Sequence, residues 1–185
     1  KLQYRKSFIQ GVKKLVSSGK LSERMLEYDL KKLSESIKIN RDHSFKYLGI
    51  QILTDRYFIR EEGKIMEAPQ SFWMRVAMGL ALNEENKEEW AVKYYDMFSQ
   101  FLYTSSTPTL FNSGTARSQL SSCYLNTFDD SIDGIFDGAW QEARKSKYAG
   151  GLGLDVTPFR STGSHIKGTN GISSGLVPWL KIYNV

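Results

Sequence analysis

The segment that decides the fold, residues 121–156, reads SSCYLNTFDDSIDGIFDGAWQEARKSKYAGGLGLDV. Its first five residues, 121–125, predict a short strand, and the apolar spacing over 131–148 predicts a helix. Leucine and valine alternate with small or polar residues over 152–156, which indicates a second strand. A further helix is expected over 176–183. This strand–helix–strand–helix order is typical of the start of an α/β domain.

The residues before this segment predict a succession of helices. Apolar side chains recur at helical spacing over 21–37 and again over 45–57. Pro69 is expected in the first turn of the next helix, where a missing N–H is tolerated. The helix after that begins among four glutamates, which suit its positive end. Its expected buried face consists of Trp90, Tyr94, Met97, Phe98, Phe101 and Leu102.

A change in composition marks the predicted domain boundary. Residues 104–122 are rich in Ser, Thr, Gly and Asn, which favours a loop or an edge segment over a helix. We therefore predict a helical domain over 1–104 and the beginning of an α/β domain over 105–185.

Composition and charge exclude some classes of protein and leave two interpretations open. The 185 residues are 41% hydrophobic and 24% charged, as in an ordinary globular protein. No apolar run approaches the ~20 residues that a membrane helix needs, so no membrane partner is expected. The net charge is +5, and residues 1–40 hold ten basic against four acidic side chains. This basic segment indicates either a solvated helix face or a module that binds nucleic acid.

The single cysteine, Cys123, is the first candidate for chemistry. One thiol excludes an intrachain disulfide, and with only two histidines a metal held by this chain is a poor candidate. A lone cysteine on a strand is more often a small buried apolar side chain than a reactive thiol. The residues that precede Cys123, which include Ser121 and Ser122, are rich in hydroxyl groups. Hydroxyl and N–H groups can bind an anion beside the thiol, which weakens the interpretation of Cys123 as a buried apolar side chain.

Glycines and basic residues further along offer weaker signals. The glycines of 150–153 precede a strand, so they form neither a Walker loop nor a dinucleotide fingerprint. They indicate only that something large lies against the backbone. Arg160 and Lys167, in a loop rich in Gly, Ser and Thr, are either a phosphate-binding pair or solvated charges.

Five motifs taken together point to a family. They are TPTLFNSG at 107–114, SSCYL at 121–125, DSID at 130–133, GGLG at 150–153 and RSTGSHIKG at 160–168. In this order and spacing they closely resemble the large (α) subunit of ribonucleotide reductase. The upstream PQSFWMRVAMGL at 69–80 is similar to that family's N-terminal helical domain. The resemblance spans essentially the whole chain.

The resemblance implies both a fold and a reaction. The fold is an N-terminal helical domain followed by the first strands and helices of a ten-stranded α/β barrel, incomplete in this chain. The reaction is the reduction of ribonucleoside diphosphates (triphosphates in some branches) to 2′-deoxyribonucleotides by thiyl-radical chemistry in the cytoplasm. In the family a thiyl radical removes the 3′-hydrogen and a glutamate takes the 3′-hydroxyl proton. Two cysteines then release the 2′-oxygen as water and form a disulfide.

The resemblance also implies roles for particular residues. Cys123 matches the redox-active thiol that faces the 2′-carbon of the substrate, a role in which a thiol donates a proton and then electrons. Substrate-contacting positions are matched by Thr107, Ser122 and Gly151. Positions that bind an effector, a deoxynucleoside triphosphate or ATP, are matched by Asp130, Ser131, Ile132, Arg160 and Lys167. Asp130 would accept a hydrogen bond from the effector's sugar, and the two basic residues would neutralise its phosphates.

Several partners follow from the resemblance. The helix over 131–148 matches one that packs across the α–α dimer. The second reducing cysteine, the radical-forming cysteine and the glutamate lie beyond Val185 in the family. We therefore expect a fragment, or one half of a split subunit, that is inactive without the C-terminal remainder of the barrel. Further expected partners are a small radical-generating subunit and thioredoxin or glutaredoxin.

The remaining expectations concern cofactors and alternatives. We expect no metal or cofactor bound by this chain itself, and a radical that comes from a di-metal partner subunit, with adenosylcobalamin as the alternative source. The family resemblance implies no direct contact with nucleic acid. Two other hypotheses are a basic helical module that binds nucleic acid and a non-catalytic partner that keeps the effector site alone. Salt-dependent DNA binding distinguishes the first of these, because counterion release requires it.

Overall fold

The computed structural model describes residues 2–148 and 150–184. The chain forms two compact units, Lys1–Leu120 and Ser121–Val185, which we call the helical unit and the βαβ unit. None of the helices among the described residues is both long enough and apolar enough to cross a membrane.

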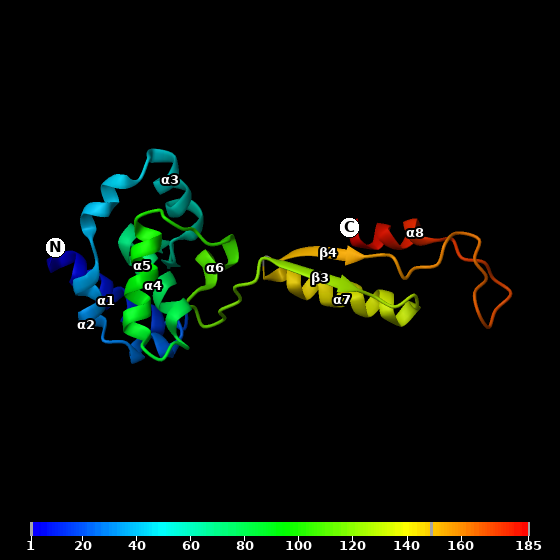
Figure 1. Ribbon diagram of the computed structural model, residues 1–185, viewed down its shortest axis with the longest axis horizontal. Coiled ribbons are helices and arrows are strands. Elements are labelled where there is room, and N and C mark those ends of the chain that lie inside the picture. The colour runs from blue at the N-terminus through cyan, green and yellow to red at the C-terminus, as the bar shows by residue number, and fades with distance from the viewer. Residues whose placement is uncertain (1, 149, 185) are drawn as a thin grey trace. The chain divides into compact units, whose positions relative to one another are not determined.

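The helical unit consists of helices of different lengths packed around the central pair α4 (Pro69–Ala81) and α5 (Lys87–Ser99), and its described residues also form a two-stranded hairpin (Figure 1). Its elements are α1 (Leu2–Ser17), η1 (Glu23–Glu27), α2 (Leu30–Ser36), η2 (Ile39–Ser44), α3 (Tyr47–Ile52), the π-helical turn η3 (Leu53–Tyr57), β1 (Arg60–Glu61), β2 (Lys64–Ile65), α4 (Pro69–Ala81), α5 (Lys87–Ser99) and α6 (Thr107–Asn112).

Helix α4 forms the centre of this unit. It begins at Pro69, as the sequence predicts, because the first helical position needs no N–H partner. Every residue from 70 to 78 is buried, so this helix has no solvated face. A helix that is apolar nearly all round is typical of a core position. The buried side chains of α1, η1, α2 and α5 pack around it in one hydrophobic cluster.

Of the six residues predicted to form the buried face of α5, only Phe98 is buried. The helix buries Ala91, Tyr95 and Phe98, which recur at helical spacing, whereas Trp90 and Met97 are exposed. Phe101 and Leu102 lie beyond the end of the helix and are exposed, and Tyr94 is half-buried.

Hydrogen bonds explain which face of α5 turns inward. The Tyr95 hydroxyl donates to Gln70 Oε1 of α4 at 2.7 Å and accepts from the Lys38 amide at 2.8 Å. The sequence of α5 contains two apolar stripes that are one residue apart. The stripe that contains Tyr95 is buried, because the Tyr95 hydroxyl also provides a hydrogen-bond donor for the buried side chain of Gln70. Apolar spacing alone does not distinguish the two faces.

The segment after α5 also differs from the sequence-based expectation. Residues 104–122 contain helix α6 instead of continuous loop, with Pro108 in its first turn. The buried guanidinium of Arg75 donates to the carbonyl oxygens of Leu110 (3.2 Å) and Ser113 (2.9 Å), which stabilises the end of this short helix. These contacts place α6 in the helical unit, so the two units divide between Leu120 and Ser121 and not at the expected 104/105.

The βαβ unit has the predicted element order. Strand β3 (Cys123–Thr127) and strand β4 (Gly151–Asp155) pair in parallel and are joined by helix α7 (Ile132–Lys147); α8 (Leu176–Leu180) and the 3-10 turn η4 (Lys181–Asn184) follow. Most ends of these elements lie within two residues of the predicted ends. Ser131 caps α7, since its hydroxyl accepts from the Gly134 amide at 3.0 Å.

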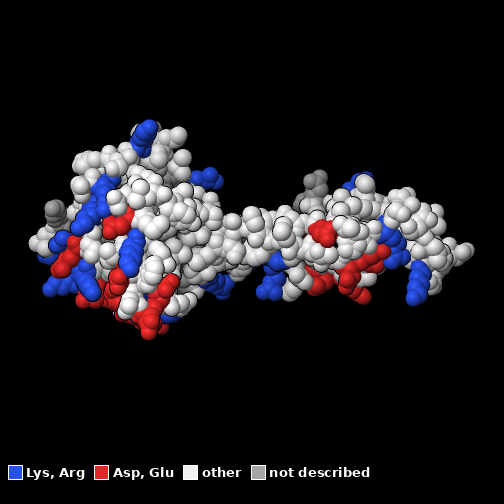
Figure 2. Space-filling view, in the orientation of Figure 1, with Lys and Arg blue, Asp and Glu red and all other residues white. Residues whose placement is uncertain are grey.

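Charged side chains of both signs share the surface of the helical unit. Figure 2 shows lysines and arginines interspersed with acidic residues on the visible face of this unit. One lysine of the basic segment 1–40 is paired with an acid outside it: Lys20 lies 3.2 Å from a Glu61 carboxylate oxygen. The mixture is what a solvated surface is expected to present.

Candidate functional site

Cys123 lies at the first position of β3, and its side chain is exposed. Successive side chains of a strand point to opposite faces of the sheet. The face that Cys123 shares with Leu125 and Thr127 is open, and all three residues are exposed. The opposite face carries Asn126, which is tied to α7 through Glu142. The interpretation of Cys123 as a buried apolar side chain is therefore wrong.

Ser122 and Gly151 lie beside this thiol. The Ser122 hydroxyl is 3.7 Å from Cys123 Sγ, and the Ser122 carbonyl oxygen accepts from the Gly151 amide at 2.6 Å. Cys123 and Gly151 are partners in the parallel register. A Cβ at position 151 would lie 3.2 Å from the Ser122 carbonyl oxygen, a tight contact, and 3.8 Å from the sulfur, an ordinary one. The glycine therefore fits closely against the Ser122 backbone next to the exposed sulfur.

Thr107, the other residue predicted to contact substrate, lies in the helical unit. It is the first residue of α6 and is exposed. Its Oγ1 shares a hydrogen bond of 3.1 Å with the hydroxyl of Tyr57, at the end of the π-helical turn η3. Sequence patterns did not identify Tyr57 as a partner of Thr107, because the two residues are 50 positions apart and share no local sequence motif.

The five residues predicted to bind an effector line a single cavity of about 280 Å³ in the βαβ unit. Asp130, Ser131 and Ile132 lie around the start of α7, while Arg160 and Lys167 come from the loop after β4. Four further lining residues were not predicted: Ile135, Ile166, Ser173 and Trp179. Ile135 lies on α7, Ile166 and Ser173 lie in the loop between β4 and α8, and Trp179 lies on α8, so the tertiary fold brings them to the cavity.

An ion pair joins the two sides of this cavity. Arg160 Nε donates to Asp130 Oδ2 at 2.5 Å, and Arg160 Nη2 donates to the Asp130 carbonyl oxygen at 3.1 Å. Both side chains keep about a third of their surface exposed, so they remain accessible to a ligand. Lys167 is exposed at the same cavity. Two cations beside an acceptor carboxylate suit a ligand that carries both phosphate and hydroxyl groups.

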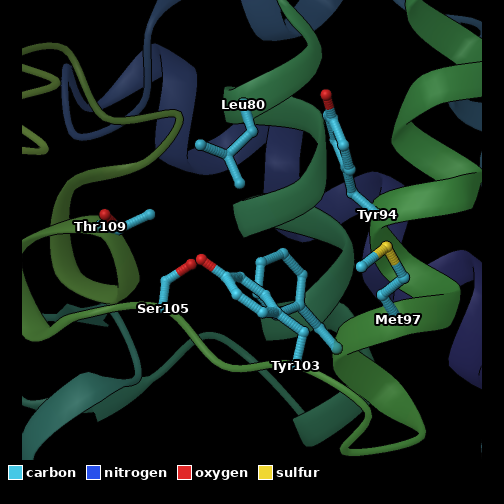
Figure 3. Close-up of a pocket in the computed structure, with 7 residues that line it drawn as sticks. Leu80, Tyr94, Met97, Tyr103, Ser105 and Thr109 are labelled. Carbon is cyan, nitrogen blue, oxygen red and sulfur yellow. The ribbon is translucent and has the colours of Figure 1, made fainter.

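A second cavity, of about 440 Å³, lies in the helical unit. It is lined by Leu80, Tyr94, Met97, Phe98, Tyr103, Ser105 and Thr109 (Figure 3). The Tyr94 hydroxyl donates to Glu84 at 3.4 Å, and burial, followed by the nearby Glu84 carboxylate, raises the pKa of this tyrosine. The lining is mostly apolar with hydroxyl groups at its edge. It contains none of the residues that the sequence predicts to carry function.

Comparison with known proteins gives the family of both units. Residues 43–118 match the ribonucleotide reductase all-alpha domain, and residues 121–185 match the ribonucleotide reductase barrel domain. The chain belongs to the ribonucleotide reductase large-subunit family. The helical unit is thus the helical domain of this family, and the βαβ unit is the start of its barrel domain. The two matches meet where the compact units divide.

Individual relatives agree with this assignment. The chain is 53% identical over 157 residues to the ribonucleoside-diphosphate reductase subunit alpha of Chlamydia trachomatis, covering 85% of this chain and 15% of the relative. It is 44% identical over 158 residues to the ribonucleoside-diphosphate reductase large subunit of Vaccinia virus, covering 83% of this chain and 20% of the relative. The chain therefore spans about a fifth or less of the length of these reductases.

Proposed function

We propose that this chain is a part of a ribonucleoside-diphosphate reductase large subunit and contributes one of the two thiols that reduce the substrate. The placement of Cys123 carries the proposal: its sulfur lies on the open face of a parallel strand pair, beside a serine and opposite a glycine. A buried sulfur with bulky neighbours would leave no room for a ribose.

The proposed chemistry is a two-electron reduction that balances within the active site. The bond between C2′ and its hydroxyl oxygen breaks, the oxygen leaves as water, and a C2′–H bond forms. Two thiols supply two hydrogen atoms and are oxidised to one disulfide. Cys123 is the proposed proton donor to the departing hydroxyl and one partner of that disulfide. The second thiol belongs to the remainder of the barrel, and a dithiol protein such as thioredoxin or glutaredoxin restores both.

The substrate contacts proposed for this chain are Thr107, Ser122 and Gly151. Ser122 offers a hydroxyl next to the sulfur, and Gly151 offers backbone that a nucleotide can approach closely. Thr107 offers an exposed hydroxyl in the helical unit. The substrate proposed is a ribonucleoside diphosphate.

We further propose that the cavity of the βαβ unit binds a deoxynucleoside triphosphate or ATP as an effector. Asp130 accepts a hydrogen bond from a sugar hydroxyl, and Arg160 and Lys167 neutralise the phosphates. The existing bonds from Arg160 to Asp130 favour this role, because they hold the guanidinium at the cavity before a ligand arrives.

Helix α7 supports a proposed α–α dimer. Ile132, Phe136 and Trp140 recur every four residues on one side of α7, and they are 58%, 52% and 57% exposed. Three large apolar side chains in one exposed row favour burial against a partner. Because the effector cavity includes Ile132, binding of an effector and dimerisation are expected to be linked.

The remaining proposed partners complete the radical chemistry. They are the rest of the barrel, which would pair with the exposed edges of β3 and β4, and a small subunit whose di-metal centre generates the radical. Adenosylcobalamin is the alternative radical source.

The test is a reconstitution with this chain, a polypeptide that carries the remaining barrel, a radical-generating subunit and a dithiol reductant. Deoxynucleotide formation is measured for the native sequence, for Cys123→Ser and for the control Tyr124→Phe. We expect formation with the native chain and the control, and none with Cys123→Ser. Product from Cys123→Ser at the native rate would refute the catalytic role of this thiol.

A further inference from the structure

The hydroxyl of Tyr57 is held in place by aromatic packing. Its ring stacks on Phe111 with ring centroids 4.6 Å apart and an interplanar angle of 21°, and it contacts Phe72 edge-on at 6.5 Å. Such paired rings stabilise one orientation of the side chain. Phe111 belongs to α6 and Phe72 belongs to α4, so the Tyr57 ring is fixed against both helices.

The backbone elements that carry Tyr57 and Thr107 are also fixed. The turn η3 is π-helical, with the Phe58 amide donating to the Leu53 carbonyl oxygen at 2.9 Å, and single π-helical turns occur frequently at functional sites. In α6, which carries Thr107, the buried Arg75 donates to carbonyl groups at the C-terminal end. Tyr57 Oη therefore meets Thr107 Oγ1 between two supported elements, at 3.1 Å.

The donors and acceptors of this pair determine what it can do. A threonine hydroxyl has one proton to donate and two lone pairs that accept. The phosphate oxygens of a nucleoside diphosphate accept only, so a hydroxyl that contacts them must donate its one proton to them. Tyr57 must then be the donor to Thr107, and a donated hydrogen bond also polarises the Thr107 hydroxyl toward donation.

We propose that Tyr57 is a positioning residue that orients the Thr107 hydroxyl for a hydrogen bond to a phosphate oxygen of the substrate. This inference rests on the proposed role of Thr107 as a substrate contact. Without the tyrosine hydroxyl, the exposed threonine hydroxyl rotates freely and must be ordered when the substrate binds. The loss falls on substrate binding, because neither residue takes part in the reduction itself.

The experiment measures KM for the ribonucleoside diphosphate and kcat in the reconstituted reductase. The variants are Tyr57→Phe, Thr107→Val, the double variant and the control Tyr47→Phe, an exposed tyrosine of α3. Phenylalanine at position 57 keeps the aromatic stack and removes only the hydroxyl. We expect Tyr57→Phe to raise KM about two- to tenfold, the effect of one ordinary hydrogen bond, with kcat and the melting temperature unchanged. The control is expected to leave all three unchanged.

The double variant separates positioning from a general effect on the fold. If Tyr57 acts through Thr107, the double variant has the same KM as Thr107→Val alone. A Tyr57→Phe enzyme with native KM, or a double variant in which the two increases multiply, would overturn the inference. If Thr107→Val itself leaves KM unchanged, the substrate role of Thr107 is refuted and the inference with it. Absence of turnover by the native reconstituted enzyme refutes the proposed function instead.

Discussion

Substitution of the buried Arg75 by methionine is expected to destabilise the helical unit strongly. Arg75 and Glu67 form an ion pair of 2.7 Å with side chains only 1% and 4% exposed. The guanidinium makes a second bond to this carboxylate at 3.2 Å and donates to carbonyl oxygens of Leu110, Phe111 and Ser113. Methionine replaces the aliphatic stem of the arginine but has no donors, so the substitution leaves a carboxylate and the end of α6 without their partner.

The expected magnitude follows from the burial of the pair. Removing one partner of a buried ion pair costs about 3–5 kcal/mol, because the remaining charge stays in a medium of low dielectric constant. An exposed pair costs far less. Lys93 and Glu89 of α5 lie 2.7 Å apart at i,i+4, with side chains 52% and 61% exposed, so solvent screens their attraction and the pair contributes little to stability. Lys93→Met is therefore the matched control.

The assay is urea denaturation followed by far-ultraviolet circular dichroism, with hydrogen exchange of the α6 amides as a local measure. We expect the free energy of unfolding of the helical unit to fall by about 3–5 kcal/mol for Arg75→Met and to change little for Lys93→Met. Amides of α6, including the Ser113 amide that donates to the Thr109 carbonyl oxygen, are expected to exchange faster. An Arg75→Met variant as stable as the control would refute the reasoning.

A double variant in which Glu67 is also replaced by methionine provides an independent check. Replacing both members of a buried pair by apolar side chains is often neutral, since no charge then remains unpaired. Recovery is expected to be partial, because Glu67 also accepts a hydrogen bond from the Ile59 amide at 2.9 Å. A double variant less stable than Arg75→Met would show that desolvation of the lone carboxylate is not the cause.

Three further predictions concern other parts of the chain. Arg160→Ala is expected to weaken binding of a deoxynucleoside triphosphate about tenfold or more, measured by calorimetry, and an unchanged affinity would contradict the proposed cavity. Phe136→Glu is expected to shift the reconstituted large subunit toward monomer in analytical ultracentrifugation, and an unaltered dimer would contradict the proposed interface on α7. Burial raises the pKa of Tyr4 from its ordinary 10.0 to about 12, so the folded state holds this proton more tightly than the unfolded state. That stabilisation is complete below pH 10 and is lost as the pH rises toward 12, and Tyr4→Phe should flatten this part of the stability curve measured by urea denaturation.

Local patterns predicted the βαβ unit well because each of its signals is local. The apolar spacing of α7, its Ser131 cap and the alternation in β4 are properties of neighbouring residues. The motifs also led to Cys123, Ser122 and Gly151, which the parallel register brings together. In the same way they led to five residues that line one cavity.

Contacts between distant residues decided what the sequence left open. The inward face of α5 depends on Tyr95 reaching Gln70, and helix α6 depends on a guanidinium 35 residues earlier in the chain. The meeting of Tyr57 with Thr107 likewise joins residues 50 positions apart. Local sequence determined the order and type of most elements through hydrophobic periodicity. The tertiary structure selected the buried faces and hydrogen-bond partners, because a buried polar group is stable only where a distant partner satisfies it.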